Sequence, residues 1–159
     1  MTRVVQFVRV TMTGLLAGNE VGTLIGFHPA LQALPLRAEI SAEQALNGRL
    51  GKIMPFYMGG TVVAAGAAAL DRRGGPGFPL ALGAAAASAV MLGITLVGNV
   101  PLNNRTLAYP GEGDEAGWSA IRRPWERLHT ARVLLDLTAF AALVTAALAD
   151  EWTAGKPRP

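Results

Sequence analysis

The sequence predicts an all-α protein, a four-helix transmembrane bundle with up-down topology and a short extra helix in its first long loop. Four apolar stretches support this prediction, at 4–27, 53–70, 78–98 and 130–149. Each has roughly the 20 residues that a helix needs to cross the hydrocarbon core of a bilayer. Charged residues make up only 16% of the chain, against about 25% in soluble domains. An integral membrane protein is therefore favoured over a soluble bundle.

The first stretch is expected to be an uncleaved membrane span and not a signal peptide. Arg9, Asn19 and Glu20 interrupt its apolar run, and no small-residue cleavage site follows. Four glycines also recur there at a spacing of four, namely Gly14, Gly18, Gly22 and Gly26. On a helix this spacing forms a stripe without side chains, which predicts close packing against a neighbouring helix.

The connections between the stretches differ in length. The first, 28–52, is long, and its Ser41-Ala-Glu-Gln44 segment resembles a capping box that opens the short extra helix. The second, 71–77, is a tight glycine-rich turn. The third, 99–129, is long again, and Pro101 is expected to stop the third helix at its start.

One membrane domain is expected over 1–149, and 150–159 is expected to be a disordered tail. Lys and Arg in short loops and near chain ends set the orientation of a membrane protein. Five such residues favour a protein of the bacterial inner membrane with both termini inside, namely Arg3, Arg72, Arg73, Lys156 and Arg158. The two long connections then lie on the outer side.

Composition also excludes several classes of site. The chain has no cysteine, which excludes disulfides, thiolate metal sites and cysteine nucleophiles. No basic stripe with interleaved aromatic residues is present, so nucleic acid is not an expected partner. Phosphate-binding loops, nucleophile elbows and dinucleotide fingerprints are also missing from the sequence. Membrane lipid is an expected partner, and a homo-oligomer remains open.

Polar residues gather where the apolar stretches would meet at one end of the bundle. In an up-down bundle the end of the first span lies beside the start of the second, the end of the third and the start of the fourth. The sequence therefore predicts one polar pocket at one membrane face, formed by Glu20, His28, Tyr57, Asn99, Asn103, His129, Arg132 and Asp136.

Trp125, His129, Arg132 and Asp136 share one helical face, because they follow a spacing of four, three and four. Arg132 and Asp136 lie inside the fourth span, where ionisable groups are costly unless paired and by default indicate function. Two interpretations are open. The face is either a functional site, or an internal Arg132–Asp136 salt bridge with His129 at the headgroup level.

Glu20 lies within the first span and must face protein or a cavity. Pairing with Arg132 is the simplest interpretation, and a neutral buried acid or a metal ligand are the alternatives. His28 and His129 are the only two histidines. With Glu20 or Asp136 they could form a site of two histidines and one carboxylate for iron or copper. Two interfacial histidines without a metal are the other interpretation.

The segment Asn99-Val-Pro-Leu-Asn103, then Trp118, then residues 123–136 resemble the anthrone-oxygenase-like membrane family. Residues 45–55 also resemble its pattern ahead of the second span. The resemblance covers about 16–148 and implies four transmembrane helices. It further implies, by analogy, oxidation of polyketide anthrones to anthraquinones without a flavin or nicotinamide cofactor.

The implied chemistry needs a base, an oxyanion stabiliser and a dry apolar pocket. An anthrone methylene that loses a proton becomes an enolate, which reacts directly with dioxygen. His129 is the predicted base, since a reference pKa of ~6.5 suits the task. Arg132 is predicted to stabilise the enolate oxygen with Asp136 orienting it, and Glu20 completes the predicted catalytic set. Predicted contacts to the flat aromatic substrate are Trp125, Tyr57, Asn99 and Asn103.

Two functions from different classes remain open. The first is a membrane oxygenase for a hydrophobic aromatic small molecule, either cofactor-free or assisted by copper, iron or haem. The second is a non-enzymatic membrane protein that binds a lipid, quinone, haem or metal, or that supports a larger complex. A tightly packed bundle with Glu20, Arg132 and Asp136 all paired would favour the second.

Overall fold

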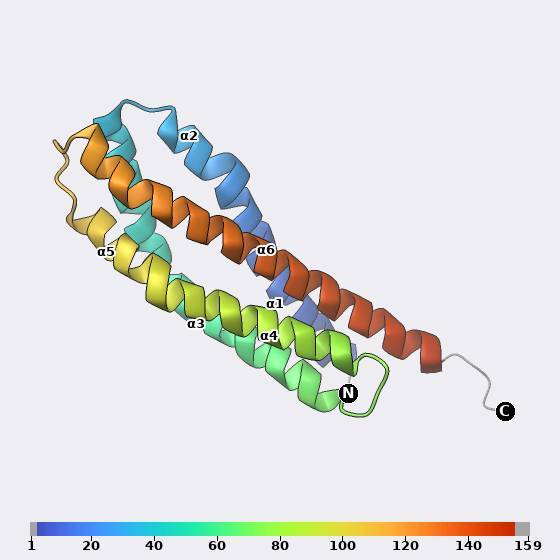
Figure 1. The fold of residues 1–159 in the computed structure, drawn as a ribbon. Helices are drawn as coiled ribbons and strands as arrows, with labels where there is room; N and C mark the ends of the chain where they lie inside the picture. Colours follow the sequence, from blue (N-terminus) through green and yellow to red (C-terminus); the bar gives the residue numbers. More distant parts are fainter. Residues whose placement is uncertain (1–2, 155–159) are drawn as a thin grey trace.

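The computed structural model describes the backbone of residues 3–154 and the side chains of 4–149, and all regular elements in this part are helices (Figure 1). In chain order they are α1 Arg3–Gly22, η1 Thr23–Phe27, α2 His28–Gln32, α3 Leu36–Asp71, α4 Phe78–Ile94, η2 Thr95–Asn99, α5 Val100–Ala108 and α6 Glu115–Ala154. The η elements are single π-helical turns inside longer helical segments. The predicted all-α fold is confirmed.

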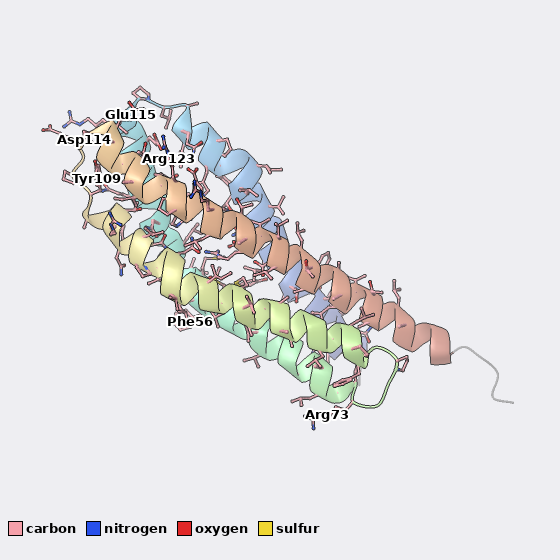
Figure 2. The ribbon with its side chains drawn as sticks, in the orientation of Figure 1. Phe56, Arg73, Tyr109, Asp114, Glu115 and Arg123 are labelled. Atoms are coloured by element: carbon pink, nitrogen blue, oxygen red, sulfur yellow. The ribbon has the colours of Figure 1, made fainter. Side chains whose placement is uncertain are left out.

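The helices run lengthwise beside one another (Figure 1). α4 packs against α3 and α6, and α1 packs against α6 and α3. The start of α1, the α3–α4 turn and the end of α6 lie at one end (Figure 1). Figure 2 shows Arg73 at this end, and Tyr109, Asp114 and Glu115 at the opposite end. The two longer connections therefore share one end of the molecule.

Three helical segments are long and apolar enough to cross a membrane, at 36–71, 78–108 and 115–149. They fit an integral membrane protein, and exposed apolar side chains such as Phe56 project from them (Figure 2). The N-terminal helix α1 is not among these candidate spans, because polar residues including Arg9 and Glu20 lower its hydropathy. The structure thus has three candidate spans plus α1, where the sequence predicted four spans.

Two predictions about the connections were wrong. Ser41 lies inside α3, where its hydroxyl donates to the Arg37 carbonyl at 3.0 Å, because α3 already begins at Leu36 after Pro35. The short helix of the first connection is instead α2, which continues α1 through η1. Pro101 does not stop the third helix, because it lies in the first turn of α5, where its missing N–H is tolerated.

The boundaries of α3, α4 and α6 test the predicted second turn and the predicted C-terminal tail. The tight second turn is confirmed, since α3 ends at Asp71 and α4 begins at Phe78. Gly74 has a φ of 80° in this turn, a conformation that favours glycine. α6 continues to Ala154, into the segment expected to be a tail. Residues 155–159, with Lys156 and Arg158, lie outside the described residues, as does the side chain of Arg3.

The core between α3, α4 and α6 is built largely from alanine. Its buried members are Ala65, Ala68, Ala69, Ala81, Ala84, Ala139, Leu143 and Ala146. Small side chains let helix backbones approach closely, which is how helices associate inside a bilayer. This tightly packed half lies toward the α3–α4 turn.

The predicted packing role of the α1 glycine stripe applies at one position. A Cβ atom at Gly14 would lie 2.8 Å from the Phe140 ring of α6. Cβ atoms at Gly18, Gly22 and Gly26 would meet nothing within 4 Å. The stripe therefore brings α1 close to α6 near Gly14 and faces open space beyond it.

Candidate active site

A cavity of about 570 Å³ lies between α1–α2, α3, the α4–α5 segment and α6. Small-molecule sites typically have volumes of about 300–1,000 Å³. Most of the apolar lining comes from α3 and the α4–α5 segment, namely Leu46, Leu50, Met54, Leu92, Leu96, Val100 and Leu107, although Asn47, Thr95, Asn103, Asn104 and Thr106 of these elements also line the cavity. Titratable groups of the lining come from α1, α2, α3 and α6, namely Glu20, His28, Glu43, Arg122, His129 and Arg132. The arrangement suits an apolar molecule with a polar reacting end.

The two π-helical turns flank this cavity, and such turns occur frequently at functional sites. Eight residues of regular α-helix rotate through about 800°, which would leave His28 about 80° from Glu20 around the helix axis. A π-helical turn takes one residue more than an α-helical turn, so η1 reduces this offset to roughly 20°. η1 thereby places Glu20 and His28 on the same side, and both line the cavity.

Glu20, His129 and Arg132 form one buried cluster. Nη2 of Arg132 donates to both carboxylate oxygens of Glu20, each at 2.6 Å. Nδ1 of His129 lies 3.3 Å from Oε2 of Glu20, and its Nε2 lies 3.1 Å from the hydroxyl of Thr23. The predicted pairing of Glu20 with Arg132 is therefore present. Both contacts are short and charge-assisted, although they come from a single guanidinium nitrogen.

Asp136 does not pair with Arg132, although the helical spacing of the two residues suggested this ion pair. Asp136 is 1% exposed, and neither carboxylate oxygen has a hydrogen-bond partner in the part of the chain that the structure describes. Arg132 turns to Glu20 instead. The alternative of an Arg132–Asp136 salt bridge is thus not what the structure contains, and the predicted orienting role of Asp136 belongs by geometry to Glu20.

A second buried cluster was missed by the sequence analysis. Nδ1 of His28 lies 2.7 Å from Oε1 of Glu43, and Nη2 of Arg122 lies 2.8 Å from the same oxygen. Glu43 was interpreted as part of a capping box, and Arg122 was given no role in a site. The missed signal is the spacing of Trp118, Arg122 and Trp125, which extends the four-three-four face of α6 by two turns.

Trp125 lies between the two clusters. Its ring stacks on His129 with centroids 4.7 Å apart and meets the edge of His28 at 4.6 Å. Cζ of Arg122 lies 4.5 Å from the Trp125 centroid, within the range of a cation–π interaction. The indole N–H donates to Oδ1 of Asn103 at 2.6 Å. Trp125 therefore fixes the position of both histidines relative to each other.

One of three comparisons with known proteins gave a match. A model of the anthrone oxygenase family matches residues 45–142. The chain belongs to the anthrone oxygenase family. Neither the curated proteins nor the solved structures that were compared with the chain gave a match. The resemblance noted in the sequence is thereby confirmed as family membership.

Within the family match lie the α6 members of both clusters, Arg122, His129 and Arg132, together with Trp125 and Asn103. Their partners Glu20, His28 and Glu43 come before residue 45 and outside the match. The structure, and not the family match, therefore supplies the carboxylate of each cluster in this member of the anthrone oxygenase family.

Two of the predicted substrate contacts do not line the cavity of this family member. Tyr57 donates to the Met12 carbonyl at 3.1 Å and packs beside Leu16, Met58 and Met91. Asn99 is fully buried and donates to the Trp125 carbonyl at 3.4 Å. By contrast, Asn103 and Trp125 line the cavity, where a ligand can reach them.

The iron or copper site, one of the two interpretations left open for the histidines, is not assembled by these residues. Within the described side chains, no group of three or more His, Asp or Glu is placed to hold a metal ion. The rings of His28 and His129 meet edge to face with centroids 5.5 Å apart. Nη2 of Arg122 lies 3.1 Å from Nδ1 of His28, and a guanidinium at that distance repels a metal cation. No step of the chemistry is therefore assigned to a metal.

Filling the cavity from α3 is expected to block it. Gly51 lines the cavity, and a Cβ atom there would meet nothing within 4 Å. Gly51→Leu should therefore fold normally and lower the affinity for an apolar ligand at least tenfold, measured as the KM for an anthrone. Gly83→Leu is the matched control, because Gly83 also faces open space but does not line the cavity. Equal KM values for both variants would contradict the assignment of this cavity as the ligand site.

Proposed function

We propose that this anthrone oxygenase family member is an integral membrane oxygenase, which converts the methylene of a flat, hydrophobic aromatic molecule into a carbonyl with dioxygen. The observation that carries the proposal is the position of His129. It is buried beside the cavity, with Glu20 at one ring nitrogen and Thr23 at the other. Glu20 is a charged group beside Nδ1, and Nε2 is the nitrogen that would take a substrate proton in place of its contact with the Thr23 hydroxyl.

In the proposed reaction His129 takes one methylene proton, and the substrate becomes an enolate. Arg132 lines the cavity beside it and stabilises the enolate oxygen. Dioxygen adds to the electron-rich carbon, and the resulting hydroperoxide loses water. The balance is one CH₂ group plus O₂ giving one C=O group plus H₂O, so no external reductant is required. The apolar lining of the cavity excludes water and holds the flat rings.

The same proposal includes four transmembrane helices in up-down topology, with α1 as the fourth span, in a bacterial inner membrane with both termini inside. Two observations support it. α1 packs against the candidate spans α3 and α6, and Arg9 of α1 pairs with Asp71 at the end of α3 at 2.6 Å. Arg72 and Arg73 share this end with Asp71, as the positive-inside rule expects of an inner face.

A second candidate is a non-enzymatic membrane protein that binds a quinone or lipid in the same cavity. The ion pairs within the two clusters favour it, since buried charges that are fully paired also serve structure alone. The cavity serves both candidates, and the position of His129 beside it with Glu20 3.3 Å from Nδ1 favours the oxygenase, because binding alone needs no base. A homo-oligomer is compatible with both candidates.

His129→Gln is expected to lower anthrone turnover by about 10²–10⁴-fold, the usual contribution of a general base. Oxygen consumption and anthraquinone formation are measured with detergent-purified protein. Thr130→Ala is the matched control, because Thr130 follows His129 on α6 and its exposed hydroxyl bonds only the Glu126 carbonyl. A fully active His129→Gln variant would exclude His129 as the base. A wild type that binds quinone but consumes no oxygen would favour the second candidate.

A further inference from the structure

His28 is a second buried imidazole at the cavity, and the proposed reaction has given it no role. It is 6% exposed and comes from α2, directly after the π-helical turn η1. Its ring lies 5.5 Å from that of His129, centroid to centroid. Both rings contact Trp125. A molecule that reaches His129 in this cavity therefore also reaches His28.

The contacts of His28 determine which ring nitrogen carries the proton. Oε1 of Glu43 lies 2.7 Å from Nδ1, and a carboxylate only accepts hydrogen bonds. Nη2 of Arg122 is 2.8 Å from the same Oε1 and only 3.1 Å from Nδ1. Nη2 of Arg122 meets hydrogen-bond geometry toward Nδ1 and forms an ion pair with Oε1, but the shorter 2.7 Å contact of Nδ1 with an oxygen that only accepts requires a proton on Nδ1. Nδ1–H then donates to Glu43, and the lone pair is on Nε2.

The two histidines differ at Nε2. In His129, Nε2 is engaged by the Thr23 hydroxyl. In His28, Nε2 has no hydrogen bond with any group in the described part of the chain, and it is not among the polar atoms that packing encloses completely. His28 lines the cavity. It therefore presents an unengaged basic nitrogen to the space where the ligand binds, while Glu43 holds the other nitrogen.

We propose that His28 is a second catalytic base, which takes the second of the two protons that leave the methylene carbon. The inference rests on the proposed oxygenase function and extends it to a site with two bases. Glu43 and Arg122 are positioning residues, because they act through the His28 ring. Two bases restrict the substrate to aromatic molecules with a methylene group that has two hydrogens to lose and lies in conjugation with a carbonyl.

The proton transfers balance. His129 takes the first C–H proton, dioxygen adds to the enolate carbon, and His129 returns its proton to the outer peroxide oxygen. Nε2 of His28 then takes the remaining C–H proton. The C–H electron pair forms the second bond of the carbonyl, the O–O bond breaks, and hydroxide leaves. Hydroxide takes the proton from His28 and becomes water, so both histidines end neutral.

The two steps can be separated by measuring oxygen uptake and quinone formation in the same sample. His28→Gln should take up oxygen in the first turnover but form anthraquinone about 10²-fold more slowly, with a hydroperoxide detected by mass spectrometry. His129→Gln should lose oxygen uptake as well. Arg127→Gln, an exposed change on α6, is the control. Anthraquinone formation by His28→Gln at the wild-type rate would overturn the inference and leave the proposed function standing.

A second readout does not depend on activity. The chain has only two histidines, so ¹⁵N-histidine labelling gives two ring spin systems, assigned by the two glutamine variants. The His28 signals should report a neutral ring with the proton on Nδ1, and Glu43→Gln should change this pattern without altering that of His129. A His28 ring protonated on Nε2 alone would overturn the inference. A wild type that takes up no oxygen with an anthrone would overturn both the proposed function and this extension.

Discussion

Arg132→Met should destabilise the protein by about 3–5 kcal/mol, the usual cost of removing one partner of a buried ion pair. Arg132 is 6% exposed and is the guanidinium that bonds both oxygens of Glu20. Without it, His129 is the remaining side chain of the described residues that pairs with the buried Glu20 carboxylate. The free energy of unfolding in mixed detergent micelles measures the effect, by the shift of the midpoint along a denaturing-detergent series.

Two further variants separate the ion pair from simple packing. Glu20→Gln combined with Arg132→Met removes both charges, and it should recover a large part of the lost stability, because no buried charge is left without a partner. Arg127→Met changes an exposed arginine of the same helix and should stay within about 0.5 kcal/mol of the wild type. A double variant as unstable as Arg132→Met would show that the loss comes from packing and not from charge.

Trp125→Ala should cost about 3–5 kcal/mol of stability and also abolish turnover. The indole is 9% exposed and contacts His28, His129 and Arg122. Removing it leaves a hole between the two clusters and frees both imidazole rings to change orientation. Unfolding in mixed micelles and anthraquinone formation are measured on the same preparation, so that loss of activity is compared with the fraction that stays folded.

Trp125→Phe separates packing from the hydrogen bond. Phenylalanine keeps an aromatic ring between the histidines but cannot donate to Asn103, which should cost about 1 kcal/mol. Turnover should remain within about tenfold of the wild type, because both imidazoles keep their ring contact. If Trp125→Phe were as damaged as Trp125→Ala, the Asn103 bond and not the stacking would be the main contribution of this residue.

The helical class and the end of the molecule that carries the site could be predicted from the sequence. Long apolar stretches require helices in lipid, because every backbone polar group must bond internally. The four-three-four spacing correctly put Trp125, His129 and Arg132 on one face of α6, and all three line the cavity. Periodicity of this kind follows from local geometry alone, so a single sequence reveals it.

Contacts between helices could not be predicted in the same way. Spacing offered Asp136 as a partner for Arg132, but an arginine that precedes its carboxylate by four residues is the weaker order on a helix. Glu20, far away in sequence, accepts two short bonds from Arg132. Glu43 and Arg122 were missed for a related reason. Each looked solvated within its own segment, and only the packing of α3 against α6 buries them together.

The two π-helical turns could not be predicted from the regular 3.6-residue period either. Proline lies just after each turn, Pro29 after η1 and Pro101 after η2. Proline cannot donate the usual i→i−4 bond and its ring clashes with the carbonyl four residues earlier, which favours a wider turn at that place. The angular shift places His28 beside Glu20, although regular spacing would have put them on different sides.

Both π-helical turns lie in the same local sequence pattern, Thr23-Leu-Ile-Gly-Phe-His-Pro29 and Thr95-Leu-Val-Gly-Asn-Val-Pro101. Each is followed by a turn and then by one long helix, α3 or α6. The chain is thus two versions of one helical hairpin with a π-helical turn in its first arm, and the cavity lies between them. His28 occupies in the first hairpin the position that Val100 occupies in the second, and both line the cavity. The same backbone pattern therefore carries an imidazole at one position of the cavity lining and an aliphatic side chain at the equivalent position. A difference in residue type between His28 and Val100 is enough to make one position reactive and the other a contact for the substrate rings.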